Sequence, residues 1–188
     1  MFGPIVYSVS VLLYHKEKKC LLLVKQFRPV VYYSKIRERL GETGLESGKV
    51  FTVDSSSIPS SSGEALELCA GLIDGVDTNA ANVAVQEVLE ECGYHIDATS
   101  LRLIDHFHSS LGLIGSHMTM FYAEVDESQR VASGGGLHEE GEVIEVIEWP
   151  VSILDKLLQP NAHRPNVSPS MLYALCWFKM NILPSLPS

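Results

Sequence analysis

Three glutamates with helical spacing are the residues of this chain best suited to chemistry. Glu87, Glu90 and Glu91 stand at positions i, i+3 and i+4 of a helix-like run that ends at Gly93. On a helix these positions share one face about a turn apart, so the three like charges repel one another. A divalent cation would offset the repulsion, because hard ions such as magnesium take carboxylate, water and phosphate oxygens as ligands. The spacing therefore predicts a metal-dependent enzyme of phosphate chemistry, and a solvated acidic helix face is the alternative.

The composition is typical of one globular domain that does not bind nucleic acid. The 188 residues carry a formal net charge of −9, whereas nucleic-acid binding rests largely on Lys and Arg. The length and the 46% hydrophobic content favour a single domain over residues 1–188. Within it, the Gly- and Ser-rich stretch 41–63 is expected to form a long flexible loop.

The cysteines and the apolar runs indicate a soluble protein of a reducing compartment. The four cysteines are scattered without a Cys-x-x-Cys pair, so we expect buried thiols rather than disulfides or a zinc site. The longest apolar runs, 5–14 and 20–24, are shorter than the roughly 20 residues that span a bilayer. The N-terminus does not have the features of a secretory signal. These features predict a cytoplasmic protein with no membrane partner.

The apolar periodicity predicts a domain that mixes strands and helices. Strands are expected over 5–14, 19–27, 64–70, 101–108, 117–125 and 142–149. A helix capped at one of residues 77–79 is expected to run to about residue 92, and further helices are expected over 151–159 and 168–180. The stretch after residue 29 is mixed and predicts no element. The fold class is therefore α/β (α+β), with a largely mixed or antiparallel sheet.

From Gly71 to Tyr94 the sequence resembles the Nudix box, in which a Gly, five residues, a Glu and seven residues precede Arg-Glu-apolar-x-Glu-Glu-x-Gly-apolar. The run EVLEECGY over residues 87–94 matches the second half in full. In the first half, Asp77 stands at the first Glu, the spacing to the helix is one residue longer, and Gln86 replaces the Arg. These changes affect an ion pair that braces the loop in the family rather than the metal ligands. The resemblance implies a Nudix fold, in which helices sandwich a mixed β-sheet.

Motifs outside the box extend the resemblance to nucleoside diphosphate-sugar hydrolases of the ADP-ribose pyrophosphatase type. They are VKQFRP at 24–29, ELCAG at 67–71 and EEGE at 139–142, in that order. Within this group the motifs are most similar to those of the animal enzymes that hydrolyse UDP-glucose to UMP and glucose 1-phosphate, which implies that substrate. ADP-ribose or another ADP-sugar is the alternative substrate. A nucleotide-binding module without turnover is the alternative class, because Asp77 and Gln86 depart from the box.

The resemblance also implies roles for individual acidic residues. It implies four ligands for Mg²⁺, or for Mn²⁺ as the alternative ion: the carbonyl of Ala70 and the carboxylates of Glu87, Glu91 and Glu142. Glu90 would share an ion or orient a water molecule. Glu140 is implied to be the catalytic base, with Glu139 as the alternative. Without the resemblance, Glu142 would more simply decorate an exposed strand face.

Three further residues are candidate contacts to the substrate. Arg28 stands at a strand-to-loop edge, where it is expected to hold a phosphate, although an ordinary surface Arg is the alternative. Glu67 would bind the nucleobase or the sugar, or simply face water. Gly112 would let its loop approach the sugar phosphate closely, although turn geometry alone would also explain it. In this group an N-terminal segment commonly builds a domain-swapped dimer. This sequence has little before its first strand, and a homodimer is nevertheless expected.

Overall fold

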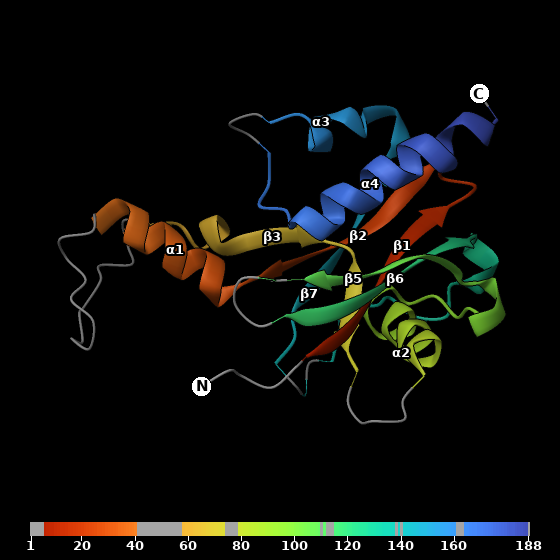
Figure 1. The fold of residues 1–188 in the computed structure, drawn as a ribbon, viewed down its shortest axis with the longest axis horizontal. Coiled ribbons are helices and arrows are strands. Elements are labelled where there is room, and N and C mark those ends of the chain that lie inside the picture. Colours follow the sequence, from red (N-terminus) through yellow and green to blue (C-terminus); the bar gives the residue numbers. More distant parts are fainter. Residues whose placement is uncertain are drawn as a thin grey trace.

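A mixed β-sheet forms the centre of the computed structural model, which describes residues 6–40, 58–73, 79–109, 111, 115–137, 139, 141–160 and 164–187 (Figure 1). Its seven strands are β1 (Tyr7–His15), β2 (Cys20–Phe27), β3 (Glu64–Glu67), β4 (Cys69–Leu72), β5 (Arg102–Ser109), β6 (Ser116–Val125) and β7 (Ile144–Pro150). The strand order is β3-β2-β1-β6-β5, with β4 also pairing β1 and β7 also pairing β2. Strands β1 and β6 are parallel, and the other pairs are antiparallel.

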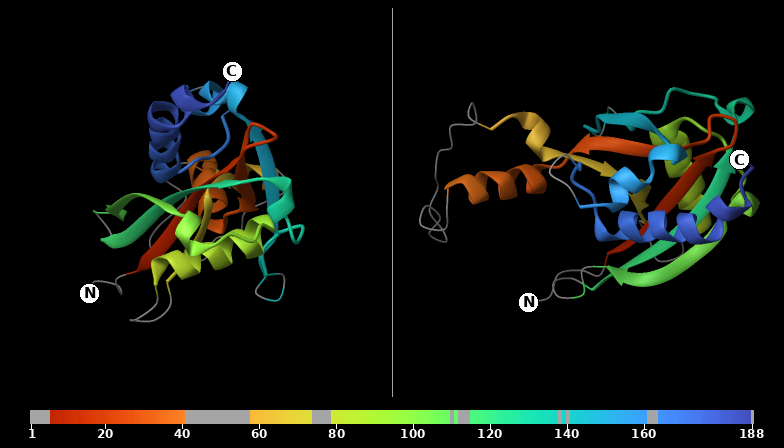
Figure 2. Two further views of the ribbon diagram at one scale, coloured as in Figure 1. Left: turned by 90° about the vertical axis from the view of Figure 1, so that its right-hand side faces the viewer. Right: turned by 90° about the horizontal axis from the view of Figure 1, so that it is seen from above.

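Helices lie on both faces of this sheet. The α-helices of the described residues are α1 (Pro29–Leu40), α2 (Ala80–Glu87), α3 (Asp155–Leu158) and α4 (Pro169–Asn181). Figure 2 shows α2 on one side of the sheet and α4 on the other, while α1 extends away from it. The predicted α+β fold, a mixed sheet between helices, is therefore confirmed. In the described part of the chain no helix combines the length and the apolar character needed to cross a membrane.

The central strands are buried on both faces, which explains their long apolar runs. Along β1, Val9, Val11 and Leu13 point into the core beneath α2. The alternating residues Leu12 and Tyr14 point into the second core beneath α3 and α4. Since successive side chains of a strand point to opposite faces, a strand covered on both sides must be apolar throughout. The same alternation continues along β2.

The structure corrects the sequence prediction between residues 29 and 72. The stretch after residue 29, which predicted no element, forms α1. The single strand predicted over 64–70 is wrong, because the chain leaves β2 after Glu67 and pairs with β1 from Cys69 onward. Of the predicted loop 41–63, residues 41–57 lie outside the described residues, and Ser60–Gly63 forms a short 3₁₀ helix.

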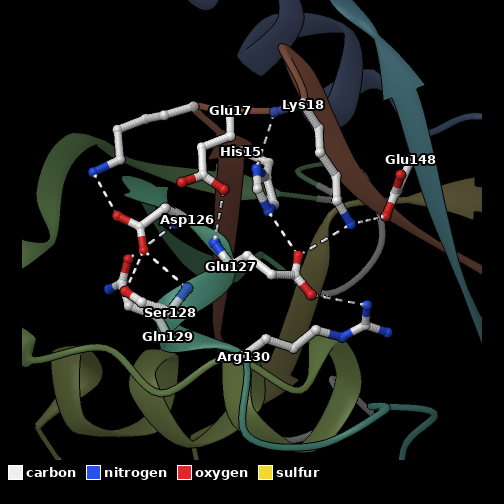
Figure 3. A network of polar contacts seen from close by, with 10 residues as sticks. His15, Glu17, Lys18, Asp126, Glu127, Ser128, Gln129, Arg130 and Glu148 are labelled. Carbon is white, nitrogen blue, oxygen red and sulfur yellow. Dashed lines mark hydrogen bonds and ion pairs between the residues drawn. The ribbon is translucent and has the colours of Figure 1, made fainter.

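A polar network closes the end of the sheet at the β1–β2 turn (Figure 3). The imidazole of His15 is fully buried; its Nδ1 accepts a hydrogen bond from the amide of Lys18, and its Nε2 lies 3.4 Å from Glu127 Oε2. The Lys18 ammonium bridges Glu127 at 3.2 Å and Glu148 at 2.6 Å. The hydrogen bond to Glu148 is the main cause that raises the pKa of Lys18 to about 12. The network thus ties the turn to β7 and to the segment after β6.

The side chain of Asn79 caps the N-terminus of α2, the helix that leads to the acidic residues. Asn79 Oδ1 accepts a hydrogen bond from the amide of Ala81 at 2.9 Å, so Asn79 is the cap among the three predicted candidates. The cap satisfies one of the amides that have no partner within the first helical turn.

We expect Asn79→Ala to lower the free energy of unfolding by about 1 kcal/mol, because the cap is lost. The exposed Asn82 lies inside the same helix and provides the matched control. Asn82→Ala should be neutral or slightly stabilising, since Ala has the higher helix propensity. Urea denaturation of both variants measures the difference, and equal values for the two would contradict the capping role.

Candidate functional site

Five of the predicted site residues line one cavity of about 440 Å³. They come from four separate segments of the chain: Arg28 after β2, Ala70 from β4, Glu87 and Glu91 from the helix over residues 80–92, and Glu142 before β7. The helix over residues 80–92 is called the acidic helix below. Strands β2 and β4 both pair with β1, at different positions along it, and this branched arrangement of β1, β2 and β4 is called the fork below. Residues of both β2 and β4 line the cavity. The topology therefore gathers residues that are more than a hundred positions apart in sequence.

The helix that carries the acids changes its hydrogen bonding at the site. It is α-helical over α2 and continues as a π-helix over Val88–Cys92, ending at Gly93 with a left-handed φ of 81°. A π-turn has i→i+5 hydrogen bonds and commonly occurs at functional sites. The three glutamates therefore do not share one open α-helical face as expected: Glu91 is turned inward and is only 3% exposed, while Glu87 and Glu90 are half-buried.

The Glu91 carboxylate is held in the protein interior by β4. Its Oε2 accepts a hydrogen bond from the amide of Ala70 at 2.9 Å. Burial raises the pKa of Glu91 to about 7, and the charge of Glu142 contributes in the same direction. The hydrogen bonds from Ala70 and from the Cys69 thiol, together with the charge of Arg28, oppose this shift. Glu91 therefore titrates near neutral pH, and a nearby positive charge would favour its anionic form.

Gly71 brings the backbone of β4 against Glu87. A Cβ atom at this position would overlap the Glu87 carboxylate, so any other residue would force that side chain to move. The glycine of the box thus has a steric role at the site. Neighbouring residues of β4 therefore contact both Glu87 and Glu91.

Glu142 is fixed by a short loop. Its Oε2 accepts a hydrogen bond from the amide of Leu137 at 3.0 Å, and its own amide donates to the Leu137 carbonyl at 3.2 Å. The side chain lines the cavity and is not on an exposed strand, because β7 begins only at Ile144. The expected strand 142–149 therefore starts two residues later than predicted.

Glu90 does not line the cavity. Its Oε1 accepts a hydrogen bond from Gln86 Nε2 at 2.9 Å, so the residue that replaces the Arg of the box binds one of the three acids. Asp77, which stands at the first Glu of the box, lies outside the described residues, as do Gly112 and Glu140. Glu139 is described and exposed.

Arg28 and Glu67 form a bidentate ion pair. Arg28 Nε donates to Glu67 Oε1 at 2.9 Å, and Nη2 donates to Oε2 at 2.6 Å. This pair is the main cause that raises the pKa of Arg28, and the charges of Glu91 and Glu142 add to it. Two parallel hydrogen bonds fix the plane of the guanidinium group. Glu67 therefore orients Arg28 toward the cavity, a role that sequence reasoning missed.

The predicted ligands are not gathered into a ready-made metal cluster. Among the described residues, no group of three acids, histidines or cysteines is close enough together to hold an ion. The acids are instead held by donors of the protein: Ala70 binds Glu91, and Leu137 binds Glu142. Both carboxylates nevertheless line the same cavity. Their negative charges repel each other, so a positive charge bound between them would be favourable.

Comparison with known proteins assigns this chain to a family. No protein-family model matches the chain. It is 38% identical over 183 residues to the uridine diphosphate glucose pyrophosphatase NUDT14 of Bos taurus and of Mus musculus, covering 95% of this chain and 80% of each relative. It is 30% identical over 145 residues to the GDP-mannose pyrophosphatase of Citrobacter koseri, covering 77% of this chain and 60% of that protein.

A solved structure agrees with these relatives. The crystal structure of an ADP compounds hydrolase has a similar fold, with a TM-score of 0.59 at 17% identity, covering 96% of this chain and 76% of that one. The relatives and the shared fold together define a hydrolase domain of the Nudix type. The chain belongs to the Nudix hydrolase family, in its group of nucleoside diphosphate-sugar pyrophosphatases.

The raised pKa of Glu91 predicts a pH-dependent stability of the metal-free protein. Relative to Glu91→Gln, the wild type should be most stable below the ordinary carboxyl pKa of 4.5, where the carboxyl is neutral in both states. This advantage should be lost as the pH rises from 4.5 to about 7, because the unfolded chain ionises the carboxyl in this range while burial keeps it protonated in the folded protein, and it should change no further above about 7. The change is on the order of 3 kcal/mol. Chemical denaturation in EDTA between pH 4 and 8 measures it, and a constant difference would contradict the burial of Glu91.

Proposed function

We propose that this chain hydrolyses the pyrophosphate bond of a nucleoside diphosphate-sugar. UDP-glucose is the proposed substrate, with UMP and glucose 1-phosphate as the products. The observation that carries the proposal is the convergence of Arg28 and three carboxylates, those of Glu87, Glu91 and Glu142, on one cavity. The relatives of this chain named above, which are pyrophosphatases of sugar nucleotides, support it.

A divalent cation, Mg²⁺ or alternatively Mn²⁺, fits the chemistry of this cavity. Its donors are hard oxygens: the carbonyl of Ala70 and the carboxylates of Glu87, Glu91 and Glu142. Burying these acids together is unfavourable, as the raised pKa of Glu91 indicates. A bound cation supplies charge that offsets their repulsion and neutralises the phosphoryl oxygens of the substrate.

The remaining residues of the site position the substrate and move a proton. Arg28, with its guanidinium fixed by Glu67, is placed to hold a phosphate of the pyrophosphate. Glu140, or alternatively Glu139, would accept the proton of the attacking water molecule. Glu90, held by Gln86, would orient water or share an ion. We propose these roles from the resemblance to the family and from the positions of the described residues.

A second cavity provides room for the parts of the substrate beyond the pyrophosphate. Its volume is about 760 Å³, and Phe107, Met118 and Tyr173 contribute to its lining. Met118 is also a lining residue of the acidic cavity. ADP-ribose, which carries adenine in place of uracil, is the second candidate substrate. Cytoplasmic location and a homodimer also stay predictions.

Purified protein with Mg²⁺ should release UMP from UDP-glucose, with a higher kcat/KM than for ADP-ribose or ADP-glucose. Glu91→Gln should abolish turnover and remain folded, because it removes a proposed ligand while keeping its shape. Chromatography of the nucleotide products measures the rates. Binding of nucleotides without release of any monophosphate would identify a binding module instead. An active Glu91→Gln variant would refute the metal assignment.

The base assignment predicts different effects at two neighbouring acids. Glu140→Gln should lower kcat by about 10²-fold or more, a typical loss for a general base. Its affinity for the cation should change little. Glu139→Gln is the matched control and should keep nearly full activity. The opposite pattern would make Glu139 the base, and an equal loss of cation affinity in Glu140→Gln would make that residue a ligand.

A further inference from the structure

Three consecutive glycines between β6 and β7 have a backbone conformation that residues with a side chain rarely adopt. Gly134, Gly135 and Gly136 have φ angles of 71°, 116° and 77°. All three lie in the left-handed region, where a Cβ atom is strained and glycine is not. These residues form a short segment, here called the glycine clamp, that lies between β6 and Glu142 in the sequence.

On one side the glycine clamp binds the end of the acidic helix. The amide of Gly135 donates to the Glu91 carbonyl at 2.9 Å, and the amide of Gly136 donates to the Glu90 carbonyl at 3.1 Å. These carbonyls belong to the last helical turn, where no intrahelical donor is available. A Cβ atom at Gly134 would overlap the Glu91 carbonyl, so the close approach requires glycine.

On the other side the glycine clamp packs against Glu142. A Cβ atom at Gly136 would lie 2.8 Å from Glu142 Oε2 and 3.0 Å from both Glu142 Cβ and Ile144 Cδ1. The carbonyl of Gly135 also accepts a hydrogen bond from the amide of Ile144 at 3.2 Å, which fixes the chain just after Glu142. One segment of three residues thus contacts the backbone that carries Glu91 and the carboxylate of Glu142.

We infer that the glycine clamp is a positioning element that sets the place of the Glu142 carboxylate relative to Glu91. The inference rests on the proposed function, in which both carboxylates bind the same cation. Two ligands from distant segments can share an ion only if their oxygens are held to a fraction of an ångström. The acidic helix alone cannot do this, because Glu142 belongs to another segment of the chain. The glycine clamp contacts both the end of the acidic helix and Glu142, and so it connects the two segments that carry these carboxylates.

Gly136→Ala tests this inference, with Gly141→Ala as its matched control. The two glycines have nearly equal φ angles of 77° and 80°, but a Cβ atom at Gly141 meets nothing within 4 Å. Both variants therefore carry similar backbone strain, and only Gly136→Ala pushes on Glu142. Manganese binding without nucleotide, measured by electron paramagnetic resonance of the free ion, gives a readout independent of turnover.

We expect Gly136→Ala to weaken Mn²⁺ binding by about tenfold or more, the usual effect of disturbing a group that supports a ligand. The kcat for UDP-glucose should fall in parallel, while KM changes less. Gly141→Ala should stay closer to the wild type in all three quantities. In a Glu142→Ala background the effect of Gly136→Ala on Mn²⁺ binding should be reduced, because the carboxylate that it displaces is absent while its contact with Ile144 Cδ1 remains.

Other results would overturn the inference. Equal losses in the two glycine variants would assign the effect to backbone strain, and an undiminished Gly136→Ala effect in the Glu142→Ala background would show that it does not act through the carboxylate. If Gly136→Ala fails to fold in both backgrounds while Gly141→Ala folds, the glycine serves folding and not positioning. Wild-type protein that binds no Mn²⁺ would overturn the metal-dependent function together with this inference, whereas the other outcomes leave that function intact.

Discussion

The burial of one carboxylate, that of Glu91, is the constraint on which the rest of the site depends. A carboxylate at 3% exposure needs hydrogen-bond donors, and the Ala70 amide supplies one only because β4 pairs with β1 beside the helix. The glycine at position 71 then allows the same strand to approach Glu87. The π-helical turn places Glu91 inward, and Gly135 and Gly136, from the segment after β6, donate hydrogen bonds to the carbonyls at the end of this helix. Each of these features would be unnecessary around a solvated acid.

The same constraint explains how a chain with a net charge of −9 can handle an anionic substrate. The basic group described at the cavity is Arg28, and the two hydrogen bonds that it donates to Glu67 fix its orientation. A single oriented guanidinium can offset only part of the charge of the acids around it. The remaining demand for positive charge is what makes the cavity suitable for a divalent cation and a pyrophosphate together. The acidity of the protein and its proposed chemistry are therefore consistent.

Sequence reasoning was most successful where a physical pattern repeats along the chain. The strands buried on both faces were predicted because their residues are apolar throughout, and the acids of the box were found by their register. The helix α1 was missed because Val30, Val31 and the tyrosines after them favour strands, and Val30 is 79% exposed in the helix. The break at Leu68 has no local signal, since it marks a change of partner strand. Long-range pairs such as Arg28 with Glu67 likewise depend on which strands become neighbours.

The parallel pairing of β1 with β6 also has a consequence for how the protein forms. Tyr7 pairs with His117 and His15 with Val125, so this pairing joins residues about a hundred and ten positions apart. Contacts of that separation carry a large loop-closure cost and slow the folding of a domain. The fork that holds Ala70 and Arg28 is local by comparison, since its strands β1, β2 and β4 all lie within the first 72 residues. During synthesis the residues of the acidic helix therefore emerge before β6 and Glu142, and the cavity cannot be complete until Glu142 has been made.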